Sequence, residues 1–399
     1  MNQQNFNWGG GGNPITKNYG VKFRLNLLKN DIFFYRYLYS HNPHSVTRKM
    51  RDIYFGYSSH KYVAKKSFLS FLTPKRYRQQ GLAFYCWQKM KKLSYKSKKI
   101  EKIYNSLLKR YIKIRVILGK VDIPYFELVL TTKCTMRCES CNNLMQYFTP
   151  NQQYTCTLEG ILQSLNILLS KVDSVGLIRV IGGEPLLFKE LPQIIRFLDL
   201  QDKIRAFNIV TNGTMMFSNE LLESLRNSHK VQVNISDYTR SPNLTLPLRH
   251  KQIMNALESY GISYSFAWSD DSSFWFNPGK IYKRNRNKND IIKNFRACRM
   301  PCVSLMSGEG ILCNTPNNTM IAPIGALFVC PIASSLSRLR GMDEFEGDFI
   351  DIANATRDRI LEFYGQDFYK VCDYCHNMWE AKQLIPIAIQ TKKILKIAP

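Results

Sequence analysis

Residues 125–141 read YFELVLTTKCTMRCESC, an apolar run that leads directly into three closely spaced cysteines. A short run rich in aromatic and β-branched residues predicts a buried strand. Cys134, Cys138 and Cys141 follow it with CxxxCxxC spacing on one short loop. Thiolates are the usual ligands of iron–sulfur clusters, and three of them bind three irons of a [4Fe–4S] cluster. Because an open coordination position is typical of metals that do chemistry, the spacing predicts a cluster whose fourth iron receives a small molecule.

The alternative for these three cysteines is a structural zinc site or a set of buried thiols. Structural zinc usually takes four ligands, supplied by two CxxC pairs or by a mixed cysteine and histidine set. The loop contains no histidine. We therefore favour the iron–sulfur cluster.

Short β-branched runs alternate with segments of helical periodicity from Val121 onward. The candidate strands are 125–130, 177–181, 206–210, 231–235 and 263–267. The candidate helices between them are 158–169, 187–198, 219–225 and 247–260. Strands separated by helices predict βαβ units, a parallel sheet and an α/β fold.

Four motifs in this region occur at the ends of successive candidate strands. They are the cysteine triplet, IGGEPLL at 181–187, VTNGT at 210–214 and VNISDY at 233–238. In this order, over roughly residues 123–270, they resemble the radical S-adenosylmethionine (SAM) superfamily. The resemblance implies a partial (β/α)6 barrel, a [4Fe–4S] cluster and SAM bound at its open iron. Ser140 departs from the aromatic residue often found before the third cysteine.

The resemblance also implies roles for individual residues. The backbone of Gly182 and Gly183 would receive the SAM amino group, and Glu184 would hold the turn. Asn212 and Ser236 would make polar contacts to the ribose or the carboxylate of SAM. Active sites of such barrels lie at the carboxyl ends of the strands, where all these residues fall.

A second group of cysteines lies in the last third of the chain. Cys313 precedes Gly325 by eleven intervening residues, four more separate Gly325 from Cys330, and Cys372 and Cys375 form a CxxC pair. This pattern resembles the SPASM and twitch extensions of some radical SAM enzymes. It implies an auxiliary iron–sulfur cluster on Cys313, Cys330, Cys372 and Cys375. Cys302 is an alternative to Cys313 as first ligand, and a structural zinc site is the alternative to a cluster.

The positive charge of the chain is concentrated at its N-terminal end. Residues 1–120 hold 26 of the 56 Lys and Arg residues but three of the 30 acidic residues. This break predicts three domains: a basic helical module (1–120), a radical SAM barrel (121–290) and an auxiliary-cluster domain (291–399). Basic residues interleaved with aromatics suit an anionic membrane surface or, less favoured here, nucleic acid.

These observations together predict a radical SAM enzyme. We expect a peptide or protein maturase that takes electrons from a flavodoxin or ferredoxin. The alternative substrate is a carbohydrate, or a lipid-linked or nucleotide-linked molecule, and a non-catalytic iron–sulfur electron carrier or regulator is the alternative of another class. Eleven cysteines without a signal-peptide pattern favour a reducing, cytoplasmic compartment, with possible peripheral contact to a membrane.

Overall fold

The computed structural model describes residues 20–27, 89, 93, 97–228, 230–267, 269, 273–277, 279–298, 303–311, 322–380 and 383–397. Of the basic module it covers chiefly two helices, α1 (Val21–Leu27) and α5 (Lys98–Ile117). The predicted membrane or nucleic-acid contacts of this module fall mostly outside the described residues. Within the described part of the chain, no helix is long and apolar enough to cross a membrane.

Five consecutive parallel strands form the centre of the fold, as the sequence predicts. They are β1 (Asp122–Thr131), β2 (Ser174–Gly182), β3 (Ile204–Thr211), β4 (Val231–Ser236) and β5 (Tyr264–Ala267). Each strand pairs in parallel with the next one along the chain. The α/β class with a parallel sheet is therefore confirmed.

Four helices connect these strands at the predicted places. They are α6 (Leu158–Lys171), α7 (Leu191–Leu200), α8 (Asn219–Arg226) and α9 (His250–Ser259). Helices α6 and α8 begin at side-chain caps, because the hydroxyls of Thr157 and Ser218 accept bonds from Gly160 N and Leu221 N. All ten residues of β1 are buried, which is typical of a parallel strand covered on both faces.

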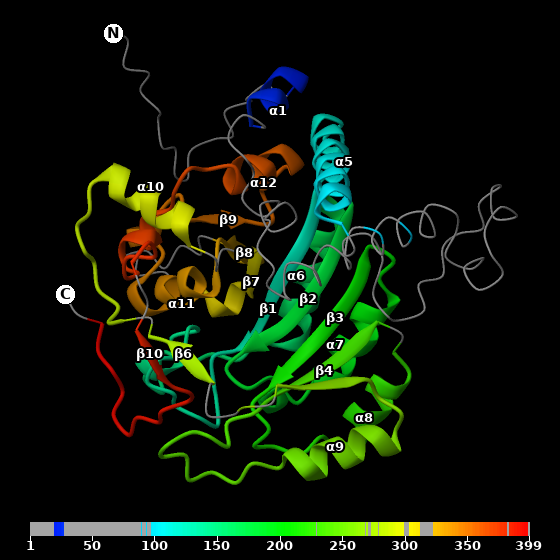
Figure 1. The fold of residues 1–399 in the computed structure, drawn as a ribbon, viewed down its shortest axis with the longest axis vertical. Helices are drawn as coiled ribbons and strands as arrows, with labels where there is room; N and C mark the ends of the chain where they lie inside the picture. The colour runs from blue at the N-terminus through cyan, green and yellow to red at the C-terminus, as the bar shows by residue number, and fades with distance from the viewer. Residues whose placement is uncertain are drawn as a thin grey trace, which may run out of the picture.

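The C-terminal elements extend the same sheet beyond β1. Strand β7 (Val303–Ser307) pairs in parallel with β1, and β8 (Gly325–Phe328) and β9 (Phe349–Asp351) continue the sheet in antiparallel fashion. Figure 1 shows α10 (Lys288–Ala297), α11 (Pro331–Arg340) and α12 (Arg357–Tyr364) gathered on this side, away from α8 and α9. The sheet thus crosses the predicted boundary at residue 290, and the three-domain division stays a prediction.

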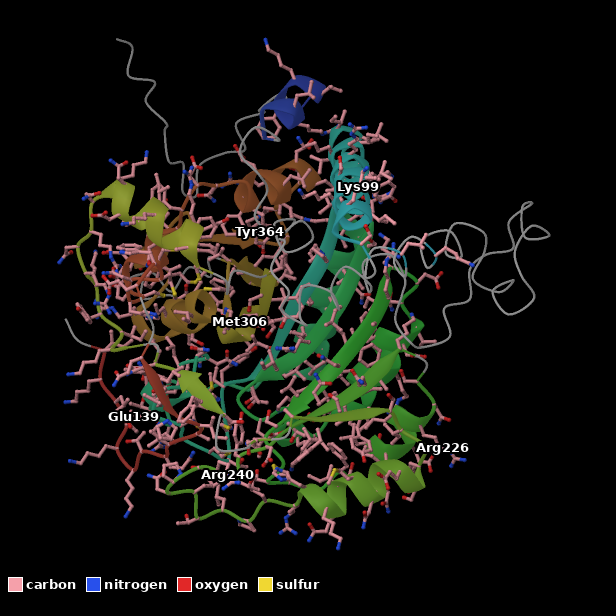
Figure 2. The ribbon with its side chains drawn as sticks, in the orientation of Figure 1. Lys99, Glu139, Arg226, Arg240, Met306 and Tyr364 are labelled. Atoms are coloured by element: carbon pink, nitrogen blue, oxygen red, sulfur yellow. The ribbon has the colours of Figure 1, made fainter. Side chains whose placement is uncertain are left out.

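A separate two-stranded sheet lies near the carboxyl ends of the central strands. Strand β6 (Phe274–Phe276) pairs in antiparallel fashion with β10 (Leu384–Pro386). In Figure 2, Glu139 marks the cysteine loop beside this pair, and Met306 marks β7. The end of the chain is thereby brought against the loop that carries the three cysteines.

Candidate functional site

The three predicted cluster cysteines lie on the cysteine loop (residues 132–144), which leaves the carboxyl end of β1. All three are free thiols, with Cys138 buried and Cys134 and Cys141 half-buried. Burial and, to a lesser extent, the neighbouring Cys141 thiol raise the pKa of the Cys138 thiol to about 12. Burial likewise raises the pKa of Cys134, with added repulsion from Glu184 and from the other two thiols. The three sulfurs therefore share one desolvated, electrostatically coupled site.

Hydrogen-bond donors surround these sulfurs. Backbone N–H groups of Met145, Asn143 and Leu144 lower the pKa of Cys141 against the effect of burial. Asn212 Nδ2 lies 3.7 Å from the Cys134 sulfur. Thiolates that are both buried and offered N–H donors need a cationic partner, since burying an unpaired charge is costly. The donor set therefore fits an iron–sulfur cluster.

No three His, Cys, Asp or Glu side chains of the described residues converge on a position for a single metal ion. A [4Fe–4S] cluster does not require such convergence, because each cysteine thiolate binds a different iron. Beside the cysteine loop lies a cavity of about 170 Å³, whose lining includes Cys134, Met136, Arg137 and Gln153. The cavity thus opens next to the first of the three thiols.

The GGE turn (Gly182–Glu184) packs directly on the base of the cysteine loop. Gly183 N donates to Thr131 O at 2.7 Å, and Glu184 N donates to Lys133 O at 2.9 Å. A Cβ atom on Gly183 would lie 1.8 Å from Lys133 O. The turn can therefore contact the loop only because Gly183 has no side chain. The sequence had indicated only that a ligand could approach the glycine backbone closely.

Glu184 connects the turn with the end of β3. The residue is 1% exposed, and its carboxylate accepts hydrogen bonds from Asn212 N at 2.8 Å and from Leu186 N at 3.3 Å. Burial raises the pKa of Glu184 to about 7, although these backbone donors oppose the shift. The Glu184 carboxylate thus bonds both within its own turn and to the residue after β3, and its role in holding the turn stays a prediction.

Asn212 also reaches the cysteine loop. Its amide donates to Thr135 Oγ1 at 2.9 Å, and its carbonyl oxygen accepts from the Thr214 hydroxyl at 2.7 Å. Ser236, at the end of β4, hydrogen-bonds the side chain of Tyr238. The structure thus brings Gly182, Gly183, Glu184 and Asn212 against the loop, with Ser236 one step removed.

An apolar wall that sequence reasoning missed covers the loop from the other side. Met136, Cys138 and Ala388 form a buried cluster, and Tyr238, Leu244 and Trp275 pack against it. The Tyr238 and Trp275 rings meet edge to face, with centroids 5.8 Å apart. The quoted VNISDY motif contains Tyr238, but no local signal links Trp275 or Ala388 to the cysteines.

Four C-terminal cysteines line a second cavity: Cys298, Cys330, Cys372 and Cys375. We call them the four-cysteine group. Burial and repulsion from the other thiols of the group raise the pKa of Cys330 and of Cys372 well above the usual range. The cavity walls are otherwise mostly apolar, including Phe295, Ile332 and Val371. The four thiols therefore line one mostly apolar cavity and repel one another electrostatically.

Neighbouring elements fix the positions of these thiols. Ala333 N, in the first turn of α11, donates to the Cys330 sulfur at 3.4 Å. The Arg286 guanidinium donates to Cys375 O at 2.8 Å, and Asn294 Nδ2 donates to Cys372 O at 3.0 Å. The CxxC loop is thus held by α10 and by the segment that precedes it.

The fourth thiol of this group differs from the one predicted. Cys302 and Cys313 lie outside the described residues, so neither prediction is tested. Cys298, which follows the last residue of α10, occupies the cavity with the other three. Sequence spacing predicts Cys313 or, alternatively, Cys302 as the first ligand, and nothing in the spacing indicates Cys298.

Polar side chains form a layer across the centre of the parallel sheet. Glu127 is in register with Arg179 on one side and with Ser304 on the other, and Arg179 is in register with Asn208. Residues in register on parallel strands share a face. Both side-chain polar atoms of Asn208 are buried without a hydrogen-bond partner. Below the cofactor site, the sheet therefore carries polar groups that an apolar core would not need.

Comparisons with known proteins agree with the cofactor site. The radical SAM superfamily model matches residues 128–260. The GTP 3',8-cyclase of Helicobacter pylori is 28% identical over 137 residues, covering 34% of this chain and 41% of that protein. The same enzyme of Ectopseudomonas mendocina is 33% identical over 119 residues, covering 29% of this chain and 33% of that protein. This chain thus matches less than half of the length of either relative.

Among solved structures, Streptococcus suis SuiB bound to its precursor peptide SuiA is 13% identical with a TM-score of 0.31, covering 41% of this chain and 37% of that chain. That TM-score is too low to establish a shared fold. The family match, by contrast, spans the cysteine loop, the GGE turn and the ends of β3 and β4. Residues 128–260 therefore match the radical SAM domain over about a third of the chain.

Proposed function

We propose that this protein is an enzyme that cleaves SAM reductively at a [4Fe–4S] cluster held by Cys134, Cys138 and Cys141 and that removes hydrogen from a substrate. The observation that carries the proposal is the packing of three desolvated free thiols against the GGE turn at the carboxyl edge of the parallel sheet. Cys134, Cys138 and Cys141 would hold the cluster, which when bound and reduced would supply the electron that cleaves SAM into methionine and a hydrogen-abstracting 5'-deoxyadenosyl radical.

The residues around the loop would position the cofactor and exclude water. The backbone of Gly182 and Gly183 and the side chains of Asn212 and Ser236 would contact SAM, while Glu184 keeps the turn and the end of β3 together. Met136, Tyr238 and Trp275 would shield the cluster, since a dry site prevents side reactions of a reactive radical. These roles are supported by the contacts of these residues with one another.

We propose a second, auxiliary iron–sulfur cluster on the four-cysteine group. Four thiolates complete the coordination of such a cluster. The resemblance of Cys330, Cys372 and Cys375 to the SPASM and twitch pattern supports it, and Cys298 takes the place proposed from sequence for Cys313. This cluster would accept the electron released when a substrate radical is oxidised.

The substrate we propose is a peptide or protein, because enzymes with SPASM or twitch extensions often modify peptides. The alternative is a nucleotide-linked or carbohydrate substrate, and the likeness to GTP 3',8-cyclases favours a nucleotide among these. The polar layer of half-buried Arg179 and buried Asn208 suits either class, because both classes carry many hydrogen-bonding groups. A flavodoxin or ferredoxin would supply the electron.

One experiment tests the activity itself. The full chain is reconstituted anaerobically with iron and sulfide, reduced with dithionite and incubated with SAM, and 5'-deoxyadenosine is measured by mass spectrometry. We expect deoxyadenosine from the wild type and none from the variant with Cys134, Cys138 and Cys141 changed to Ala. C156A, which removes a buried thiol outside both groups, is the matched control and should keep the activity. A reconstituted wild type that forms no deoxyadenosine would instead be the electron carrier of the alternative hypothesis.

A second measurement addresses the substrate. Bound substrate increases deoxyadenosine formation when the radical is consumed productively. We therefore expect a small peptide encoded beside this gene to stimulate turnover and to gain a mass change. Stimulation by GTP, with no effect of the peptide, would favour the nucleotide alternative.

A further inference from the structure

The end of the chain forms a strap over the cysteine loop. Residues 383–391 are here called the C-terminal strap, and Gln390 of the strap forms an isolated antiparallel β-bridge with Cys138 of the loop. Glu139 N donates to Ile389 O at 2.7 Å, and Thr391 N donates to Arg137 O at 2.9 Å. The strap and the loop are about 250 residues apart in sequence, so this contact is purely tertiary.

The side chain of Gln390 is aimed at a cluster ligand. Its Nε2 donates to the Cys138 sulfur at 3.3 Å and to Ala388 O at 2.6 Å. Its Oε1 accepts from Arg137 N at 2.9 Å. These contacts define the orientation of the amide, because the reversed orientation would place its oxygen against Ala388 O and its NH₂ group against the Arg137 N–H. One N–H therefore remains to point at sulfur.

The backbone of the strap is anchored independently of the cysteine loop. Asn243, in the segment after β4, accepts from Gln390 N at 2.8 Å and donates to Gln390 O at 2.9 Å. Ser241 Oγ donates to Ala388 O at 2.8 Å. Ala388 is fully buried and has a φ of 50°, a left-handed conformation that costs a non-glycine residue energy. The strap is thus held in one conformation from its far side.

We propose that Gln390 is a positioning residue that donates a hydrogen bond to the Cys138 thiolate and thereby raises the reduction potential of the cluster. Hydrogen bonds to cluster sulfurs are one of the determinants of the potential, because an N–H dipole stabilises the more negative, reduced state more than the oxidised state. The proposal rests on the proposed function, since it requires a cluster on Cys138. It adds that the electron-accepting step is tuned by the opposite end of the chain.

Two variants and a control measure the effect. In Q390M the side chain keeps its length and loses the donor, while Q390E places a carboxylate oxygen where the NH₂ group was. The control is Q383M on the same strap, where the exposed Gln383 side chain accepts a hydrogen bond from Asn277. Each reconstituted protein is titrated with dithionite mixtures while the reduced cluster is followed by electron paramagnetic resonance.

We expect Q390M to disfavour reduction by about tenfold, or 59 mV for a one-electron couple. Q390E should disfavour it more because it adds a negative charge, and Q383M should match the wild type. Equal potentials in Q390M, Q390E and the wild type at equal iron content would overturn the proposal. A wild type that assembles no cluster on the loop would instead overturn the proposed function.

A wild-type measurement keeps the test independent of variant folding. Protein grown with side-chain ¹⁵N-glutamine is reduced, and pulsed electron paramagnetic resonance is used to detect weak coupling between the cluster and ¹⁵N. We expect such a coupling and an exchangeable proton that disappears in D₂O. Their absence in a well-reduced wild-type cluster would also refute the hydrogen bond.

Discussion

Changing Gly183 to Ala tests whether contact between the GGE turn and the cysteine loop builds the cluster site. The new Cβ would lie 1.8 Å from Lys133 O and 2.4 Å from Lys133 C, whereas real Cβ atoms essentially never lie closer than 3.0 Å to such atoms. Turn and loop must therefore separate by at least about 1.2 Å. Both sides of the clash are backbone, so no side-chain rotation relieves it.

Overpacking of this kind typically costs about 1–3 kcal/mol, and we expect the upper end of that range for the free energy of unfolding. The displacement also moves Cys134 relative to the other thiols, so G183A should lose most of its loop-bound iron. The matched control is G261A, since no atom lies within 4 Å of its Cβ position. Its φ of 65° makes alanine cost about 1–2 kcal/mol without touching the site.

The assays are urea unfolding of the apo protein and iron per chain after reconstitution. To isolate the loop cluster, both variants are made in a background with Cys298, Cys330, Cys372 and Cys375 changed to Ala. G183A should combine destabilisation with iron loss, and G261A should show destabilisation alone. If G183A bound iron like the wild-type background, the contact between turn and loop would not be what positions the thiols.

Three further predictions follow from the same contacts. C298A should lose the iron of the four-cysteine group, whereas C156A should keep all iron; unchanged iron in C298A would exclude Cys298 as a ligand. The pKa of Glu184 is about 7 in the folded apo protein, above its unfolded value, so the stability that this group contributes is present below about pH 4.5 and lost as pH rises through 7. The free energy of unfolding should therefore fall less between pH 5 and pH 8 in E184Q than in the wild type. An equal fall in both proteins would contradict the raised pKa of the buried carboxyl. N243A should release the strap and increase the rate at which a chelator removes iron. The control is N354A, on an exposed turn; equal rates in the two variants would mean that the strap does not protect the cluster.

Much of the cofactor site could be predicted from short stretches of sequence. The apolar run of β1 and the spacing of Cys134, Cys138 and Cys141 are local, because a strand and the loop that follows it occupy neighbouring residues. The strands β2 to β4 and their terminal motifs were predictable for the same reason. The periodicities of strand and helix are visible within a dozen residues.

Other parts of the site could not be predicted in this way. Burial decides that the Glu184 carboxyl has a raised pKa, and burial belongs to the folded chain. The pairing of β7 with β1 depends on which edge of the sheet is available, and the sequence of either strand leaves that open. The spacing to Gly325 favours Cys313 over Cys298, so the sequence alone gives no reason to choose Cys298.

The sequence by itself determined an α/β fold with a cysteine loop suited to a cluster with one open iron, because these features arise from residues close together along the chain. Only the tertiary structure decided that Cys298 joins Cys330, Cys372 and Cys375, and that Gln390 reaches the Cys138 sulfur. Such contacts join residues tens to hundreds of positions apart. They arise from how whole elements pack, and packing leaves no fixed spacing in the sequence.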